Sequence, residues 1–254
     1  MSSSLTTPTL NIVLREMRDV AIKPYNKKFD YSYSFGVYPT IELLTHQPKE
    51  ALKVLIHSKG KQNDGVRKIQ DICHKLGIRV ETADGLINKL TSSENTYAIG
   101  IFNKYKSEVT KGLNHVVLVN PEDSGNLGTV IRTSLGFGVN NIAIIKPGVD
   151  CFDPKTVRAS MGSIFQANIE YFEDFDRYKE IHKNNCYMFM VHGDTELSRT
   201  DFEKPWSLVF GSESAGLNAD FRKYGKTVYL KQSNYIDSLN LSMAVGIALY
   251  KTFA

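Results

Sequence analysis

The chain has 254 residues, of which 42% are hydrophobic, and it carries a formal net charge of +4. This composition excludes a disordered or fibrous protein, and no apolar run approaches the ~20 residues of a membrane-spanning helix. Three widely spaced cysteines, Cys73, Cys151 and Cys186, argue against a disulfide framework and a cysteine-based metal site. Together with a polar N-terminus that lacks the pattern of a secretory signal, they indicate a reducing, cytoplasmic location.

The excess positive charge lies in the first half of the chain. Residues 1–112 contain 17 Lys/Arg and 11 Asp/Glu, a net charge of +6, whereas residues 113–254 contain 14 and 16, a net charge of −2. A basic half indicates a polyanionic partner, of which nucleic acid is the commonest. A solvated lysine-rich surface explains the charge equally well, and charge alone leaves both interpretations open.

Residues 1–106 are predicted to form an N-terminal arm and a small α/β domain. Mixed apolar and basic residues over 1–30 predict a helical arm that ends at Pro24. The aromatic stretch 31–40 (YSYSFGVYPT) favours packing residues over residues that stack on bases. After it, helices are predicted at IELLTH (41–46), PKEAL (48–52) and GVRKIQDICHKLG (65–77), and strands at KVLIHS (53–58), IRVE (78–81) and YAIGIFNKY (97–105). The polar residues 107–114 predict a linker.

Residues 115–254 are predicted to form a second, larger α/β domain. Strands are predicted at 116–119, 141–145, 187–191, 207–211 and 227–230, and helices at 124–136, 154–161, 174–184, around 217–224, and 238–252. Near-continuous apolar strands separated by helices predict a parallel sheet that is covered on both faces. Ligands of such sheets bind beyond the C-terminal ends of the strands, where polar, glycine-containing loops follow three of these runs. The last helix is apolar on nearly every side, which predicts burial, in part against a partner subunit.

The segment DSGNLGTVIRTS (123–134) carries the first candidate motif. Asp123 or Ser124 is expected to cap a helix. Gly128 and Arg132 are four residues apart and share a helix face, so the glycine leaves bare backbone beside the guanidinium for a ligand to approach. Asn126 lies about 600° of helical rotation from Arg132, on a different face. An ordinary helix entry followed by a surface arginine fits the same residues.

Two further motifs follow later strands. In VFGSESAGLN (209–218), Gly211 and Gly216 flank the carboxylate of Glu213, which fits either a plain tight turn or a loop whose amides approach a ligand. The spacing does not match a dinucleotide-binding fingerprint, and the chain contains no Walker A sequence, so NAD chemistry and nucleotide hydrolysis are disfavoured. In YIDSLNLSMAVGIALY (235–250), Ser238 is expected to cap the last helix and Asn240 to lie in its first turn.

The three motifs together resemble the SpoU (TrmH-like) family of RNA ribose methyltransferases. The resemblance covers about 113–254, and residues 40–105 look more loosely like the RNA-binding domain that often precedes this catalytic domain. The matching residues are Asn126, Gly128 and Arg132 in the first motif, Gly211, Glu213, Gly216 and Leu217 in the second, and Ser238, Leu239, Asn240 and Ser242 in the third, with Arg158, Ser160 and Gly162 in a segment between the first two.

The resemblance implies a fold, a cofactor and an assembly. The fold is a parallel α/β sheet with a C-terminal deep trefoil knot, placed at 115–254, with 107–114 as the linker and 1–106 as the RNA-binding part. The cofactor is S-adenosyl-L-methionine, and no metal is required. The partners are RNA, with ribosomal RNA favoured over transfer RNA, and a second copy in a homodimer. The residues implied for the cofactor are Gly211, Gly216, Leu230 and Leu239, with His192 and Gly193 on the adenosine side.

The implied reaction moves a methyl group to a ribose 2′-hydroxyl. Arg132 would act beside the cofactor of the other subunit, either as base or as an organiser of proton departure, because free arginine holds its proton strongly. Asn126 would orient Arg132 or the ribose, and Glu213 would hold the loops together. Ser238 and Asn240 would position the arginine and the nucleotide.

The chain departs from the family pattern in its cofactor loop. Residues 230–234 are Leu-Lys-Gln-Ser-Asn, without the proline and glycine that the family commonly has there. This departure leaves open a non-catalytic RNA-binding protein with the same fold. An enzyme that methylates an RNA base and an enzyme that methylates transfer RNA also fit the motifs.

Overall fold

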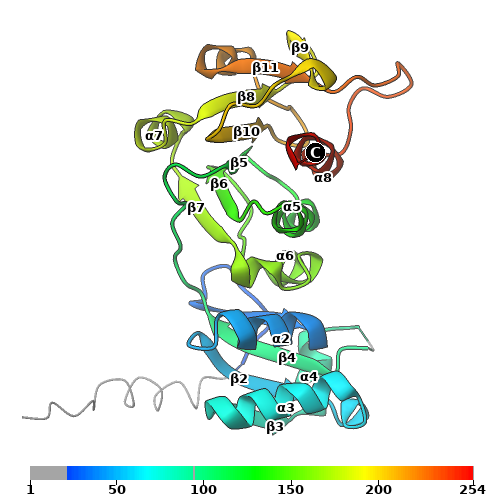
Figure 1. Ribbon diagram of the computed structural model, residues 1–254. Coiled ribbons are helices and arrows are strands. Elements are labelled where there is room, and N and C mark those ends of the chain that lie inside the picture. The colour runs from blue at the N-terminus through cyan, green and yellow to red at the C-terminus, as the bar shows by residue number, and fades with distance from the viewer. Residues whose placement is uncertain (1–21, 94, 254) are drawn as a thin grey trace, which may run out of the picture. The chain divides into compact units, whose positions relative to one another are not determined.

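A computed structural model describes residues 22–93 and 95–253, which divide into two compact units after Asn103 (Figure 1). The arm predicted over 1–30 lies mostly outside the described residues, and its described part, 22–30, contains no helix. No helix in the described ranges is long and apolar enough to cross a membrane.

The first unit contains a four-stranded mixed sheet in the order β1-β4-β2-β3. Its elements are β1 (Tyr31–Phe35), α2 (Val37–His46), β2 (Ala51–Ile56), the 3-10 turn η2 (Ser58–Gly60), α3 (Asp64–Leu76), β3 (Arg79–Thr82), α4 (Asp84–Leu90) and β4 (Ala98–Asn103). β4 is antiparallel to β1 and β2, and β3 runs parallel to β2. The α/β alternation predicted for this part of the chain is therefore present.

The aromatic stretch 31–40 contributes mainly to packing. Tyr31 and Tyr33 are buried in the core of the first unit, whereas Tyr38 is exposed. The strand at Tyr31–Phe35 is not predicted from the sequence, and the helix predicted at 48–52 is wrong. Five residues are too few to nucleate a helix, and the Asn103 N–H donates to the Glu50 carbonyl (2.9 Å), which continues the β ladder.

Helix α3 confirms the amphipathic pattern. The Asn63 side chain accepts hydrogen bonds from the Gly65 and Val66 N–H groups, which caps the first turn. Val66, Ile69 and Cys73 face the core. Gly77 ends the helix with a φ of 68°, a left-handed conformation that favours glycine.

The second unit is a seven-stranded sheet in the order β7-β6-β5-β10-β8-β11-β9, in which every pair is parallel. Its strands are β5 (His115–Val119), β6 (Asn141–Ile145), β7 (Asn168–Phe172), β8 (Asn185–Phe189), β9 (Thr195–Glu196), β10 (Trp206–Phe210) and β11 (Lys226–Tyr229). Its α-helices are α5 (Ser124–Gly136), α6 (Pro154–Ala159), α7 (Phe175–Ile181) and α8 (Leu241–Phe253), and its 3-10 segments are η3 (Ser163–Gln166), η4 (Leu197–Arg199) and η5 (Ala219–Tyr224). The predicted α/β class with a parallel sheet is confirmed.

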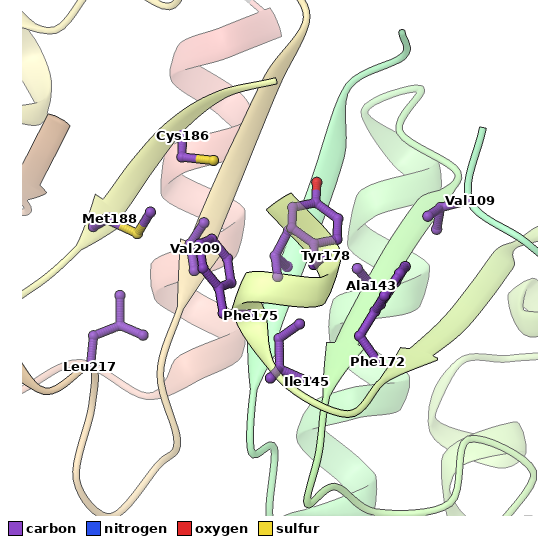
Figure 2. Packing of buried hydrophobic residues seen from close by; sticks show 11 residues of the cluster. Val109, Ala143, Ile145, Phe172, Phe175, Tyr178, Cys186, Met188, Val209 and Leu217 are labelled. Atoms are coloured by element: carbon purple, nitrogen blue, oxygen red, sulfur yellow. The ribbon is translucent and has the colours of Figure 1, made fainter. Parts of the chain in front are cut away.

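The sheet of the second unit is covered on both faces. Helices α5, α6 and α8 lie on one face, and α7 lies on the other (Figure 1). Phe175 and Tyr178 of α7 pack against strand residues such as Val209 and Met188 (Figure 2). Because β5, β6 and β10 are buried along almost their whole length, they appear in the sequence as continuous apolar runs. The edge strand β7 is only partly buried, and for that reason the sequence pattern does not predict it.

Residues 107–114 pack on the second unit. The Ser107 hydroxyl donates to the Ile169 carbonyl (2.9 Å) and accepts from the Ile169 N–H (2.8 Å). The Val109 N–H donates to Glu170 Oε2 (2.9 Å), and the Val109 side chain is buried in the core. These contacts hold the segment that is predicted as the linker along the β7 edge.

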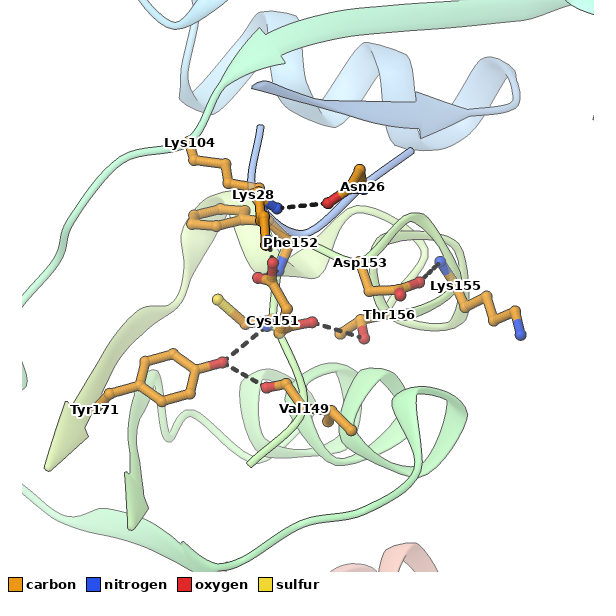
Figure 3. A network of polar contacts seen from close by, with 11 residues as sticks. Asn26, Lys28, Lys104, Val149, Cys151, Phe152, Asp153, Lys155, Thr156 and Tyr171 are labelled. Carbon is orange, nitrogen blue, oxygen red and sulfur yellow. Dashed lines mark hydrogen bonds and ion pairs between the residues drawn. The ribbon is translucent and has the colours of Figure 1, made fainter. Parts of the chain in front are cut away.

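Polar contacts also fix the loop between β6 and α6 (Figure 3). The Tyr171 hydroxyl donates to the Val149 carbonyl (2.7 Å) and accepts from the Cys151 N–H (2.8 Å). Burial raises the pKa of the Cys151 thiol to about 12, so this thiol stays protonated. The loop therefore presents a fixed start to α6.

Candidate functional site

The first motif starts α5 at the C-terminal end of β5. The Asp123 carboxylate accepts from the Asn126 N–H (2.7 Å), so Asp123 is the cap. Leu127, Val130 and Ile131 are fully buried beneath the helix. The expected helix over 124–136 is confirmed.

Gly128 is a packing residue, and the prediction that it gives a ligand room beside Arg132 is wrong. A Cβ at this position would lie 2.5 Å from the Thr156 carbonyl oxygen, 2.6 Å from Ala159 Cβ and 2.8 Å from the Ser160 N. The glycine therefore allows α5 to approach α6 closely. The helix backbone is bare at Gly128, as the spacing predicts. The segment that packs against it is α6 and not a ligand.

The Glu213 carboxylate joins the second motif to the first. Its Oε2 accepts from the Glu122 N–H (2.9 Å), and its Oε1 accepts from the Asp123 N–H (3.3 Å) and from Asn126 Nδ2 (3.0 Å). A carboxylate at the start of α5 also interacts favourably with the helix dipole. Glu213 thus holds the loop after β10 against the start of α5.

The glycines beside Glu213 make this loop tight. A Cβ on Gly211 would lie 1.9 Å from the Gly216 carbonyl carbon, and the Gly216 N–H donates to the Ser212 carbonyl (2.9 Å). Gly216 has a φ of 66°, in the left-handed region. The loop is a tight turn, and the same turn aims Glu213 at the first motif.

Asn240 joins the third motif to the first. Its Nδ2 donates to Asn126 Oδ1 (3.0 Å), while its own Oδ1 accepts from the Ser242 N–H (2.9 Å) and hydroxyl (2.7 Å). The Asn240 carbonyl accepts the first helical bond from the Ala244 N–H (3.0 Å), so Asn240 is the N-cap of α8. The predictions that Ser238 caps this helix and that Asn240 lies in its first turn are wrong, because α8 begins at Leu241.

These three motifs surround a cavity of about 580 Å³, which we call the motif cavity. Eight of the eleven residues predicted for the site line it: Asn126, Gly211, Glu213, Gly216, Leu230, Ser238, Leu239 and Asn240. The sequence analysis does not single out several other residues that line the cavity. They are Phe189, Met190, Val191, Phe210, Leu241 and Ala244. The sequence shows only that these residues lie near the ends of predicted strands or in the last predicted helix.

Arg132 does not line the motif cavity. Its side chain is exposed on α5, and within the described chain its guanidinium makes no hydrogen bond or ion pair. The next residue, Thr133, lies against α8, where its Cγ2 would be 3.6 Å from a Cβ on Gly246. The arginine therefore lies on the exposed side of α5, outside the cavity of its own chain.

His192 and Gly193, which the resemblance implies for the adenosine side, do not line the motif cavity itself. A Cβ on Gly193 would lie 2.6 Å from the Val228 carbonyl carbon, so the glycine is pressed against β11. The Asp194 N–H donates to the Thr227 hydroxyl (2.9 Å), and the His192 carbonyl accepts from Arg222. These bonds hold the loop on the strand, and Val191 is its last residue at the cavity.

Helix α8 is buried on one side only, and the burial against a partner subunit that the sequence predicts stays a prediction. Leu241, Val245, Ala248 and Leu249 are buried against the unit. Four large apolar side chains, Met243, Ile247, Tyr250 and Phe253, are exposed on the other side.

A second polar cluster lies at the opposite, N-terminal ends of the strands. His115 Nδ1 is 2.7 Å from the Tyr178 hydroxyl, which is 2.6 Å from the Ser207 hydroxyl, and His115 Nε2 is 2.8 Å from the Thr110 carbonyl oxygen. The His182 ring stacks on Tyr178 at a centroid distance of 5.0 Å. Its two ring nitrogens are buried without a hydrogen-bond partner among the described residues. Burial, with smaller contributions from His115 and Lys111, lowers the pKa of His182 to about 4, and burial also lowers the pKa of His115.

Comparisons with known proteins cover both parts of the chain. The model of the SpoU rRNA methylase family matches residues 114–250. An uncharacterized tRNA/rRNA methyltransferase of Archaeoglobus fulgidus is 30% identical over 209 residues, which are 80% of this chain and 93% of that protein. An uncharacterized tRNA/rRNA methyltransferase of Synechocystis sp. is 31% identical over 140 residues, 54% of this chain, and the match spans about half (51%) of that longer protein.

A solved structure resembles the chain over nearly its whole length. The AdoMet-bound rRNA methyltransferase from Sinorhizobium meliloti aligns with a TM-score of 0.75 and 25% identity, covering 99% of this chain and 96% of that one. Three findings agree: the family match, the relative that aligns over most of the chain, and the three joined motifs. The chain therefore belongs to the SpoU rRNA methylase family.

Proposed function

We propose that this protein transfers a methyl group from S-adenosyl-L-methionine to a ribose 2′-hydroxyl of structured RNA. The observation that carries the proposal is the hydrogen-bonded chain from Glu213 through Asn126 to Asn240, which brings three distant motifs to one cavity. The methyltransferase names of the relatives support the reaction class. Ribosomal RNA is the favoured substrate and transfer RNA the alternative.

The motif cavity fits the cofactor in size and chemistry. Its volume lies within the ~300–1,000 Å³ usual for small-molecule sites. Phe189, Met190 and Phe210 offer apolar surface for the adenine, and the backbone at Gly211, Leu230 and Leu239 offers hydrogen-bonding groups. Bound there, S-adenosyl-L-methionine supplies an electrophilic methyl group. His192 and Gly193 directly follow Val191, which lines the cavity, and would lie near the adenosine side of the cofactor.

The site residues take distinct roles in the proposed reaction. Glu213 holds the loops, while Asn126 and Asn240 fix each other at the cavity rim. Ser238, which lines the cavity, positions the incoming nucleotide. The 2′-oxygen bonds to the methyl carbon as the carbon–sulfur bond breaks, and its proton must leave in the same step. In-line geometry supplies much of the rate.

We further propose that Arg132 acts in the motif cavity of a second copy. Arg132 is exposed and does not line its own cavity, and its neighbour Thr133 lies against α8. The apolar face of α8 (Met243, Ile247, Tyr250 and Phe253) supports burial against that copy. In a two-fold dimer, each subunit would lend its arginine to the other. There Arg132 would assist departure of the 2′-hydroxyl proton, either as acceptor or by organising its path.

The finer fold proposal is a deep trefoil knot formed by the C-terminal part of the chain. The loops after β10 and β11 both line the motif cavity, and the chain then returns to α5 through the bond between Asn240 and Asn126. An experimental structure that traces residues 230–254 tests this; a path that does not pass through an earlier loop would refute the knot.

The first unit, with the charge excess of its half of the chain, would bind RNA.

Two measurements test the function. Calorimetry with S-adenosyl-L-methionine should detect one site per chain, and no binding at millimolar ligand would sink the methyltransferase proposal in favour of a non-catalytic RNA-binding protein. Mass spectrometry of nuclease-digested RNA after reaction should find the methyl group on ribose. A methylated base would refute the 2′-O assignment and leave a base methyltransferase.

A further inference from the structure

The loop of residues 231–238 forms one wall of the motif cavity. It joins β11 to the segment that leads into α8 and projects from the unit (orange in Figure 1). Gln232 and Asp237, one on each leg of the loop, line the cavity. Gln232 Nε2 donates to the Asp237 carbonyl (2.9 Å), which closes the base of the loop. The tip of the loop, residues 233–236, is therefore held beyond the cavity.

Tyr235 stands at this tip. It is 96% exposed, more than any other large hydrophobic side chain that the structure describes. Within the described residues it makes no hydrogen bond and no ring contact. Its neighbour Ile236 is half-exposed and adds apolar surface beside the ring, while Lys231, Ser233 and Asn234 make the rest of the loop polar. The ring is thus an isolated aromatic surface in a polar loop that carries one lysine and one aspartate, Asp237.

The loop differs from the other exposed apolar region of this unit. On α8, four apolar side chains follow one another along a helix face, as at the interface of two protein subunits. The 231–238 loop has one aromatic ring among hydrogen-bonding groups, which is the composition of surfaces that bind unpaired nucleotides. The two regions therefore fit different partners, a second copy for α8 and a nucleic acid base for the loop.

We propose that Tyr235 stacks on an unpaired base of the RNA substrate, next to the ribose that enters the motif cavity. This inference rests on the proposed function. A ribose bound in the cavity lies beside this loop, because Gln232 and Asp237 form part of the cavity wall. Bases inside an A-form duplex are stacked on each other and cannot pack on a side chain. Tyr235 thereby selects a substrate whose target lies in a loop, a bulge or a single strand.

A Tyr235→Trp variant of the full chain reports stacking directly. The native chain has one tryptophan, Trp206, which is only 2% exposed. An added tryptophan at 235 is therefore the residue whose fluorescence a bound RNA can quench. Fluorescence is titrated with a single-stranded RNA oligonucleotide and with a fully paired duplex of the same sequence. We expect quenching by the single strand and little change with the duplex. The matched control is Tyr250→Trp on α8, which should not respond to RNA.

Kinetics give the second readout. Tyr235→Ala should raise the KM for RNA by about 5- to 150-fold, the range of one base–aromatic stacking contact, with little change in kcat or in S-adenosyl-L-methionine binding. Tyr235→Phe keeps the ring and should stay within about twofold of the wild type. An unchanged KM in Tyr235→Ala, or an unquenched Tyr235→Trp when the wild type binds the same RNA in a filter assay, overturns the stacking proposal alone. A wild type that binds no RNA overturns the proposed function as well.

Discussion

The two ends of the parallel sheet in the second unit carry polar clusters of opposite character. At the C-terminal ends, Glu213, Asn126 and Asn240 are hydrogen-bonded around an open cavity. At the N-terminal ends, His115, Tyr178 and Ser207 form a chain of hydrogen bonds whose side chains are fully buried. Both clusters join distant segments, but only the first leaves its groups accessible to a ligand. We infer that the first serves chemistry and the second serves stability.

The largest expected effect is that of Arg132→Ala. Because Arg132 is exposed and lies outside its own cavity, the variant should fold normally and bind S-adenosyl-L-methionine almost as the wild type does. Methyl transfer should fall by about 10³-fold, since the group that assists departure of the 2′-hydroxyl proton is lost. Single-turnover assays with RNA and calorimetry with the cofactor measure the two quantities. Unchanged turnover would show that the arginine is misassigned.

Glu213→Gln should come next, with a loss of about 10²-fold in activity. The amide replaces one acceptor oxygen by an NH₂ group, which then faces the N–H donors of Glu122, Asp123 and Asn126. Steady-state methylation is the measurement. The matched control is Glu180→Gln, an exposed glutamate on α7, which should leave activity unchanged. If Glu213→Gln and Glu180→Gln were equally active, the role assigned to Glu213 would be wrong.

At the N-terminal ends of the strands, the expected effect is on stability and depends on pH. The pKa of His182 is lowered to about 4 in the folded chain, so the unfolded chain binds a proton first as the pH falls below about 6.5. The free energy of unfolding should therefore fall between about pH 6.5 and about pH 4, by on the order of 2 kcal/mol, and level off below. Urea unfolding of the wild type and of His182→Phe measures this. If the variant keeps the full pH dependence, His182 is not its source.

Tyr178→Phe should have the smallest effect, again on stability alone. The variant keeps the ring but removes the hydroxyl that bridges His115 Nδ1 and Ser207 Oγ, which leaves two buried polar groups unpaired. The free energy of unfolding should fall by about 1–2 kcal/mol, and methylation at about 25 °C should be unchanged. A loss of activity that exceeds the loss of folded protein would contradict the division between the two ends.

The strands of the second unit are predictable for a physical reason. Strands buried on both faces, such as β5 and β10, read as continuous apolar runs, and glycine-containing polar loops mark their ends. The edge strands β7 and β9 lack that signature, and the sequence pattern does not predict them. Each motif loop taken alone also fits an ordinary helix entry, turn or cap, and the three can be identified from sequence only because their combination resembles a known family. Their assembly at one cavity follows from the parallel sheet.

The spacing of residues along the chain does not predict which distant segments pack against each other. Gly128 shares a helix face with Arg132, but the sequence does not reveal that α6 occupies that face. Ser238 and Asn240 are both good caps, and the structure makes Asn240 the cap, where it also donates to the distant Asn126. The same limitation applies to Gly193, whose backbone is pressed against β11. In each case the residue contacts a segment distant in sequence.

The central claim is that methyl transfer occurs at the C-terminal ends of the strands, in a site that Arg132 of a second copy completes. Co-expression of Arg132→Ala and Glu213→Gln chains with different tags, followed by tandem purification, isolates mixed dimers. Each mixed dimer would hold one intact cavity facing one intact arginine, so we expect about half of the wild-type methylation of ribose, although each parent dimer is nearly inactive. Mixed dimers as inactive as the parents, or a chain that is monomeric, would contradict the account.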